Sequence, residues 1–414
     1  MDVGEVDLLV GISSHQNEKT AGHALQAVER MFQRHFTRQR AVIVDACAES
    51  KEGDEPAPSG LSNVAGDNRS LSEQNALRTI QQVKLKFTAP PSSGVAVRTI
   101  LAAADLLRAR ACAVVSPRTA GLSPDWIPNL LTPIYRDKFD FVAPLYIRHK
   151  FQGLLARNLL YPMSQAIFGC GIRELYSEEW GFSSRLGAAC LSQDIWDEEP
   201  IRARPEAWMG ISAMSADFQC CQSFLGQKLQ ATSGSGTDIV EIFRQAVSSL
   251  FWCIESCQAE WLIGERSETV RTFGLEHALT DEPTNINRGR IFEMFQSGVR
   301  ELEPILGTIL DPETHAEIKN IVSLPEARFR FGTKLWVRTV YDFAASYHHV
   351  VMTRDHLVQA LTPLYRGMTF SFLAEHSQSS PDEMEAASQE LCSEFQHQKP
   401  YLKEKWKAKL EVES

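Results

Sequence analysis

The first half of the chain alternates short apolar runs with segments whose apolar residues recur at helical spacing. Apolar runs typical of strands buried in a parallel sheet occupy 6–12, 41–45, 111–115 and 141–146. A further strand is expected at 83–87, and helical spacing predicts helices over 18–35, 95–110 and 154–168. This alternation predicts an α/β fold with a mostly parallel sheet.

The second half of the chain has a different pattern. After the break Ser233-Gly234-Ser235-Gly236, apolar spacing is mostly helical, with further helices expected at 288–310, 336–352 and 382–395. The last fifteen residues are rich in Lys and Glu and are expected to fray. The sequence therefore predicts an α/β domain over 1–232 and a mostly helical domain over 233–414, with a surface loop at 49–75.

Composition and charge narrow the class of protein. The 414 residues include 42 basic and 52 acidic side chains, a formal net charge of −10, with 43% hydrophobic residues. This is typical of a globular chain, and the acidic excess argues against nucleic acid as a partner. The N-terminus lacks a signal pattern and no apolar window suffices for a transmembrane segment, so we expect a cytoplasmic protein.

The cysteines and the common catalytic motifs exclude several chemistries. Nine cysteines are scattered without a CxxC pair, which favours reduced thiols, and Cys253 and Cys257 are interpreted as small core residues. The sequence contains no GxSxG, P-loop, GxGxxG or HExxH motif. Hydrolase, P-loop, dinucleotide and zinc-protease chemistry are therefore not indicated.

Polar residues follow three of the predicted strands, at 13–17, 45–47 and 116–118. In open parallel sheets, ligands bind in the crevice outside the carboxyl ends of the strands. The sequence therefore predicts a binding site at this edge. A helix is expected to begin after it, with Ser123 as the N-cap and Pro124 in the first turn.

Several short segments together form a recognisable composite pattern. They include Ser123-Pro124-Asp125-Trp126-Ile127, Asn158-Leu159-Leu160-Tyr161-Pro162, Trp180-Gly181-Phe182-Ser183 and Pro363-Leu364-Tyr365-Arg366-Gly367. In order and spacing the pattern resembles the GT-A-fold glycosyltransferases that include mannosylglycerate synthase and glucosylphosphoglycerate synthase. The resemblance implies a Rossmann-like GT-A domain, a nucleotide-sugar donor and a small acceptor. Homo-oligomerisation is left open.

The resemblance also implies a divalent metal, Mg²⁺ or Mn²⁺, held by an Asp-x-Asp motif and a histidine. This chain has Ser116-Pro117-Arg118 at the Asp-x-Asp position, and no histidine occurs between His149 and His277. The ligands of that metal are therefore absent, and no cofactor is expected. The family's Gly-Lys-Gly turn reads Ser92-Ser93-Gly94, and its phosphoglycerate-gripping element reads Gly153-Leu154-Leu155-Ala156, so phosphoglycerate is not supported as acceptor.

The resemblance gives a set of candidate site residues. Arg118 would replace the metal by pairing with diphosphate oxygens, and Glu179 would orient the sugar. The remaining candidates are Ser13, Asn17, Glu18, Asp45 and Ser116 for the nucleotide sugar, and Glu178 and Glu206 for the acceptor. Several also have a structural interpretation. Asn17 and Glu18 form a pair at a helix start, where Glu18 is favourable by itself; Asp45 is the residue that ends a strand; and Arg118 and Glu179 are solvated loop residues.

Three functions remain open. The first is a divergent glycosyltransferase that works without the Asp-x-Asp metal site. The second is a catalytically inactive pseudo-glycosyltransferase that keeps the fold as a binding or scaffolding module. The third is a small-molecule binder that uses the same crevice for an unrelated ligand.

Overall fold

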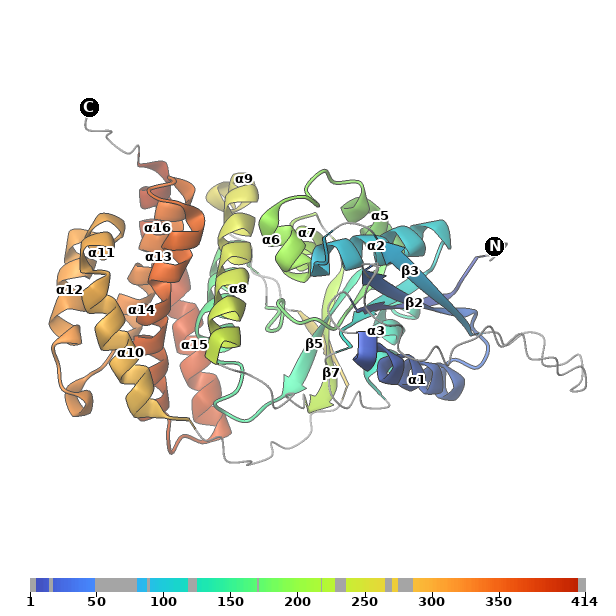
Figure 1. The fold of residues 1–414 in the computed structure, drawn as a ribbon, viewed down its shortest axis with the longest axis horizontal. Helices are drawn as coiled ribbons and strands as arrows, with labels where there is room; N and C mark the ends of the chain where they lie inside the picture. The colour runs from blue at the N-terminus through green and yellow to red at the C-terminus, as the bar shows by residue number, and fades with distance from the viewer. Residues whose placement is uncertain are drawn as a thin grey trace, which may run out of the picture. The chain divides into compact units, whose positions relative to one another are not determined.

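A computed structural model describes residues 5–14, 18–48, 80–87, 90–117, 125–169, 171–216, 218–227, 236–264, 270–274 and 286–408 (Figure 1). The chain forms two compact units. Unit 1 comprises Met1–Pro144, Glu178–Pro205 and Phe218–Ala231, and unit 2 comprises Leu145–Ser177, Glu206–Asp217 and Thr232–Ser414. The predicted combination of an α/β part with a helical C-terminal part is confirmed. Unit 2 also includes residues 145–177 and 206–217, which were expected in the N-terminal domain.

Unit 1 is built on a mixed sheet. Its strands are β1 (Leu8–Ser13), β2 (Ala41–Ala48), β3 (Gln81–Phe87), β4 (Ala111–Val115), β5 (Phe141–Ile147), β6 (Trp180–Ser183) and β7 (Cys220–Gln227), in the order β3-β2-β1-β4-β6-β5-β7. The pairs β1–β2, β1–β4 and β2–β3 are parallel, whereas β6 runs antiparallel to β4 and β5. All residues of β1 and β4 are buried, which explains their continuous apolar sequences.

Helices cover both faces of this sheet. α1 (Glu18–His35) and α3 (Trp126–Tyr135) pack together on one face, and α2 (Ser93–Leu106), α5 (Ser184–Leu191) and α6 (Glu199–Ala203) pack together on the other (Figure 1). Because α1 follows β1 and α2 follows β3, both helices begin beyond the carboxyl ends of parallel strands. That edge is therefore where loops and helix N-termini converge.

The start of α2 explains the Ser92-Ser93-Gly94 sequence. The backbone N–H of Val95 donates to the hydroxyl of the N-cap residue Ser92 at 3.3 Å. A Cβ atom on Gly94 would lie 2.7 Å from both the Cα of Arg202 and the carbonyl oxygen of Ile201 in α6. Glycine is required here because the backbones of two helices approach closely, so its presence does not depend on a ligand.

Replacing Gly94 with alanine is expected to destabilise unit 1 by about 1–3 kcal/mol, the usual cost of overpacking. Gly22→Ala is the matched control, because nothing lies within 4 Å of a Cβ at that position in α1. The control should stabilise the protein by about 0.5–1 kcal/mol through helix propensity. Urea unfolding of both variants measures the difference, and a Gly94→Ala protein as stable as Gly22→Ala would contradict the close approach.

Unit 2 is mostly helical. Its elements are η2, a π-helical turn (Ala156–Leu160), α4 (Tyr161–Phe168), α7 (Pro205–Ser215, all but its first residue), α8 (Gly236–Ser256), α9 (Gln258–Ile263), β8 (Arg271–Phe273), α10 (Arg288–Glu301), α11 (Glu303–Ile309), α12 (Pro312–Val322), η3 (Glu326–Arg328), α13 (Thr333–His348), α14 (Arg354–Glu375), α15 (Pro381–His397) and α16 (Lys399–Lys407). The single helix predicted at 288–310 is two helices: α10 ends at Glu301, and α11 begins at Glu303 with Pro304 in its first turn.

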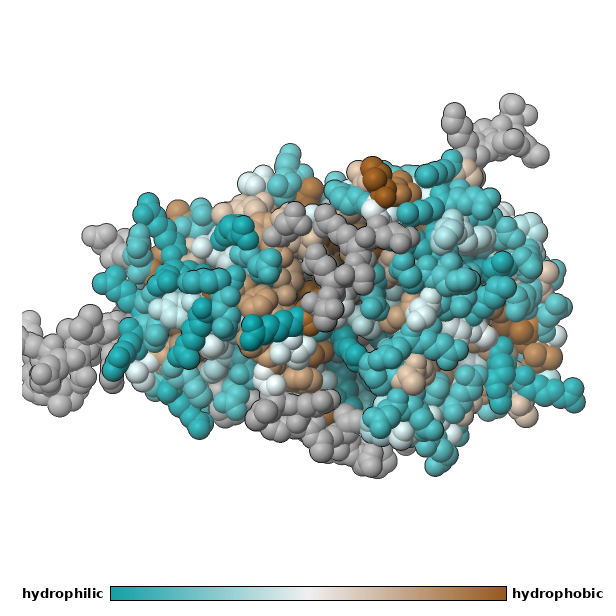
Figure 2. All heavy atoms as spheres, turned by 180° about the vertical axis from the view of Figure 1, so that it is seen from behind, coloured by the Kyte–Doolittle hydropathy of each residue, from teal (hydrophilic) through white to brown (hydrophobic). Residues whose placement is uncertain are grey.

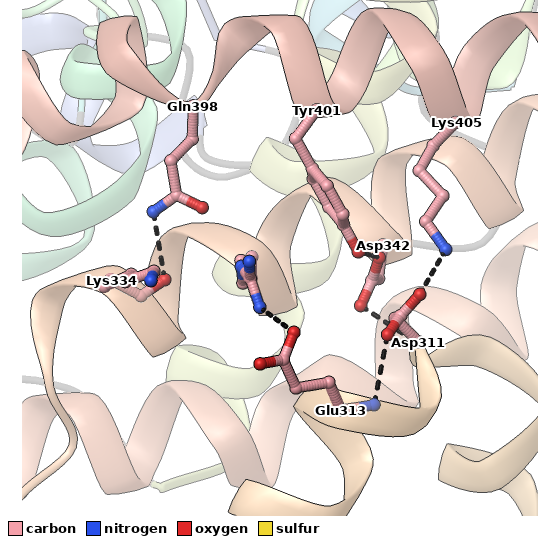
Figure 3. Close-up of polar contacts among 8 residues, drawn as sticks. Asp311, Glu313, Lys334, Asp342, Gln398, Tyr401 and Lys405 are labelled. Carbon is pink, nitrogen blue, oxygen red and sulfur yellow. Dashed lines mark hydrogen bonds and ion pairs between the residues drawn. The ribbon is translucent and has the colours of Figure 1, made fainter.

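The expectation that the last fifteen residues fray is wrong for 400–407. These residues belong to α16, where Leu402 and Trp406 are buried. Polar contacts also hold the helix: the Tyr401 hydroxyl donates to Asp342, and the Lys405 ammonium contacts Asp311 at 2.7 Å (Figure 3). The Lys/Glu-rich composition misled the prediction because one face of α16 is apolar.

Few large hydrophobic side chains of the described residues are exposed. Among the described residues, the exposed large hydrophobic side chains are Leu106, Ile242, Ile263, Ile305 and Val350. The face seen in Figure 2 is mostly hydrophilic, with apolar areas that are small. Within the described ranges, no helix combines the length and the apolar character that a membrane span requires.

Candidate functional site

The carboxyl edge of the sheet brings several predicted site residues together. Register aligns Ile12 of β1 with Asp45 of β2 on one side and with Val115 of β4 on the other. Ser13 and Ser116 are the next residues along β1 and β4, so both lie at the same edge. All three polar residues, Ser13, Asp45 and Ser116, are buried. These residues lie at the same edge because the three strands are paired in parallel.

The fourth strand of this edge carries Glu179. β6 runs antiparallel to β4, and Val114 is paired with Trp180. Glu179, which precedes Trp180, therefore lies level with Val115 at the carboxyl end of β4, and its side chain is completely buried. The strand order β2-β1-β4-β6 arranges Asp45, Ser13, Ser116 and Glu179 in one row. With neighbouring strands about 4.8 Å apart, the row is about 14 Å long.

Ser14 contributes a contact that the sequence analysis missed. Its hydroxyl donates to the Asp45 carboxylate and lies 3.2 Å from the carbonyl oxygen of Ala46. Its backbone N–H donates to the same carbonyl at 3.1 Å. These bonds tie the end of β1 to β2 and fix one oxygen of Asp45. The only sequence signal was a second serine next to Ser13.

Three candidates lie wholly or partly outside the described residues. Arg118 and Asn17 are outside them, and of Glu18 only the backbone, which begins α1, is described. The predicted N-cap Ser123 is outside them as well. The suggested pairing of Arg118 with diphosphate therefore stays a prediction, two residues beyond Ser116.

The acceptor candidates lie in different units. In unit 1, Glu178 forms an ion pair with Arg204 at 3.7 Å, and both side chains are largely shielded from solvent. In unit 2, Glu206 is buried in the first turn of α7. Burial raises the pKa of the Tyr176 phenol well above its ordinary value, and the nearby Cys253 and Glu206 raise it further. Glu206 thus belongs to the interior polar surroundings of Tyr176.

The described donors do not fit the metal site that the resemblance implies. Mg²⁺ and Mn²⁺ prefer oxygen ligands, mainly carboxylates. The position after β4 offers the Ser116 hydroxyl and Pro117 where the family has carboxylates. Across the described ranges, no three His, Cys, Asp or Glu side chains converge as a metal site. We therefore assign no step to a metal at this edge.

The fold defines an α/β protein with a polar carboxyl edge and an added helical unit. No protein-family model and no curated protein matches the chain. Among solved structures, it is similar to glucosyl-3-phosphoglycerate synthase from Mycobacterium tuberculosis in complex with Mn²⁺, UDP and phosphoglyceric acid, with 14% identity, a TM-score of 0.41, and coverage of 60% of this chain and 78% of that chain.

A second similar structure is mannosyl-3-phosphoglycerate synthase from Rubrobacter xylanophilus, with 13% identity, a TM-score of 0.37, and coverage of 61% of this chain and 75% of that chain. Both are enzymes of the kind that the sequence resembles. Because identity and TM-score are this low, the function proposed below rests on this chain's own residues.

Proposed function

We propose that this chain is a divergent glycosyltransferase-like protein that binds a nucleotide sugar at the carboxyl edge of β2, β1, β4 and β6. The observation that carries the proposal is the row of buried polar residues Asp45, Ser13, Ser116 and Glu179. The four residues gather beyond the carboxyl ends of strands, which is where open parallel α/β sheets bind their ligands. The reaction is transfer of the sugar to a small acceptor.

The row suggests a division of roles along the nucleotide sugar. Asp45 accepts hydrogen bonds from ribose or base, and Ser13 and Ser116 supply hydroxyl groups near the diphosphate. The N-termini of α1 and α2 begin beyond the same edge, and helix N-termini favour anions. Glu179, at the other end of the row, accepts from sugar hydroxyls. Arg118 follows Ser116 closely enough in sequence to pair with the leaving diphosphate, in place of a metal.

A catalytically inactive binding module is the second candidate. Two observations favour it: Ser116-Pro117-Arg118 replaces the carboxylates of the related enzymes, and the Asp45 carboxylate is already hydrogen bonded to Ser14. The first candidate predicts that nucleotide sugars bind and stabilise the protein, whereas the inactive module predicts no such stabilisation.

Binding is tested by thermal denaturation with UDP- and GDP-sugars, each with Mn²⁺ and with a chelator. A donor at 100 times its dissociation constant should stabilise the protein by about 2.7 kcal/mol. The shift should persist in chelator and shrink in Asp45→Asn, which keeps the volume and loses the charge. Asp105→Asn, an exposed carboxylate of α2, is the matched control and should behave as wild type. Absence of a shift with every donor would overturn the proposal.

A further inference from the structure

A pocket lies at the end of the unit 1 sheet opposite the carboxyl ends of β1, β2 and β4. It is lined by residues at the amino ends of β4, β5 and β7 and at the carboxyl end of β6, and its volume is about 430 Å³. Sites for small molecules typically measure about 300–1,000 Å³. Arg110 lines this pocket, and Ser116 lies six residues further along the same strand, which corresponds to about 20 Å. The pocket is therefore separate from the row that contains Asp45.

Three cations line this pocket against one carboxylate. The cations are Arg110, Lys138 and Arg185, and the carboxylate is Asp140. Asp140 is buried, and its oxygens accept from Arg185 at 2.5 and 3.2 Å, from the Ser183 hydroxyl at 2.7 Å and from the backbone N–H of Gln219 at 3.1 Å. The charge of Asp140 is thus matched by Arg185, and neither Arg110 nor Lys138 pairs with it.

The pKa of Asp140 supports this charge assignment. Burial would raise it, but the hydrogen bonds from Arg185, Ser183 and Gln219 together lower it below the ordinary value. Asp140 is therefore ionised at neutral pH and holds Arg185 in place. The guanidinium of Arg185 also lies over the Phe218 ring at 4.5 Å, while its side chain stays 65% exposed. One face of this cation is accordingly available to a ligand.

The other two cations are also positioned by the fold. Arg110 lies over the Tyr135 ring and makes a long ion pair of 3.5 Å with Asp7. Lys138 is exposed, and within the described ranges no carboxylate contacts its ammonium group. Its backbone is left-handed, with φ of 64°, in the turn between α3 and β5. Glycine adopts that conformation more readily, so a lysine at this position adds backbone strain to the folded state.

Neutral donors complete the pocket. α5 begins at Ser184, and the backbone N–H groups of Ser184 and Arg185 precede the first possible intrahelical bond. Ser183 caps the helix through the N–H of Leu186, at 3.2 Å. Ser184 and Arg185 both line the pocket, so the N-terminus of α5 lies beside its cations. Together, cations and a helix N-terminus are the chemistry that binds phosphate.

We propose that this pocket binds the phosphate group of a small phosphorylated molecule, held by Arg110, Lys138 and Arg185 at the N-terminus of α5. The formal charge of the whole chain is −10, so its general field repels anions and any binding depends on this local excess of positive charge. The site is distinct from the proposed nucleotide-sugar row and does not depend on it.

The test uses inorganic phosphate and pyrophosphate as probes, titrated calorimetrically into the full chain at constant ionic strength. Wild type should bind saturably, and acetate at equal concentration should not compete. Lys138→Gly and Arg110→Gln should each raise the dissociation constant by about tenfold, the loss of one charge-assisted hydrogen bond. Lys138→Gly also removes the left-handed strain, so its Tm should be no lower than that of wild type.

Arg136→Gln is the matched control, because this exposed arginine lies two residues from Lys138 and does not line the pocket. Its dissociation constant should stay within about twofold of wild type. Three results would each overturn the proposal: no saturable binding by wild type, unchanged affinity in both pocket variants, or an equal loss in Arg136→Gln. UDP-sugar binding serves as the independent readout, and it should be unchanged in Lys138→Gly.

Discussion

The free energy of unfolding of unit 2 is expected to fall by about 3–5 kcal/mol when Trp336 is replaced with alanine. Trp336 is completely buried in α13, where its ring packs against Phe331 at 5.8 Å and Tyr365 at 6.3 Å. Its indole N–H also donates to the backbone carbonyl of Asn158 at 2.8 Å. The alanine variant loses apolar burial and this bond together.

The bond to Asn158 has a local cause. In an α-helix its carbonyl would accept from the residue four positions on, which is Pro162, and proline has no N–H. The chain forms the π-helical turn η2 there, and the indole of Trp336 supplies a donor from another helix. A side chain far away in sequence thus donates to a carbonyl whose usual α-helical donor is a proline.

Trp336→Phe separates the two contributions. Phenylalanine keeps most of the apolar ring but cannot donate, so the cost should be about 1–3 kcal/mol, that of a buried carbonyl left unpaired. Native-state hydrogen exchange at amides of α13 and α14 measures the free energy of unfolding of unit 2 by itself. Unfolding of the whole chain would not separate the two units. Equal losses in the alanine and phenylalanine variants would contradict a packing role for the ring.

Strands β1, β2 and β4 could be predicted from sequence because they are buried on both faces. The apolar runs of β1, β2 and β4 stand out, and the residues after them fall at the carboxyl edge by the geometry of parallel pairing. This geometry placed Asp45 and Ser116 at the predicted binding edge, and the family resemblance gave them their candidate roles. The placement of Glu179 required more, because β6 is only four residues long and its antiparallel register with β4 cannot be deduced from a pattern.

Features that depend on distant partners could not be predicted. The pocket of Arg110, Lys138 and Arg185 joins residues from three separate parts of the sequence, and none is unusual by itself. The fraying expected at the C-terminus was wrong for a related reason. Composition describes the exposed face of α16, while Trp406 packs against Trp261 at 5.2 Å and makes the helix part of unit 2.

The second large effect on stability is expected at Asp342, which contacts the polar side of α16. Asp342 of α13 is buried, and its carboxylate accepts from the Tyr401 hydroxyl at 2.5 Å and from the backbone N–H of Asp311 at 3.0 Å (Figure 3). It therefore connects α16 with the N-cap residue of α12. Asp342→Ala should destabilise unit 2 by about 3 kcal/mol, because two hydrogen bonds to a carboxylate are lost and the Asp311 N–H loses its acceptor.

Asp342→Asn should cost much less at neutral pH. The asparagine oxygen can accept from the Asp311 N–H, and its NH₂ group can donate to the Tyr401 oxygen. Burial raises the pKa of Asp342, and the hydrogen bonds from Tyr401 and Asp311 only partly offset this. Folding therefore favours the protonated acid, and that stabilisation is complete below the unfolded pKa of about 3.9 and is lost as pH rises through the folded value.

The asparagine variant removes this titration while keeping the shape. Between about pH 4 and pH 7, wild-type unit 2 should lose more stability than Asp342→Asn, and the difference isolates the proton linkage of one carboxyl. Hydrogen exchange of α13 and α16 amides at both pH values measures it, with Tyr401→Phe as the variant that removes one donor from the ionised form. Parallel pH profiles for wild type and Asp342→Asn would mean that Asp342 keeps an ordinary pKa, and the carboxylate would then be solvated in spite of its burial beneath α16.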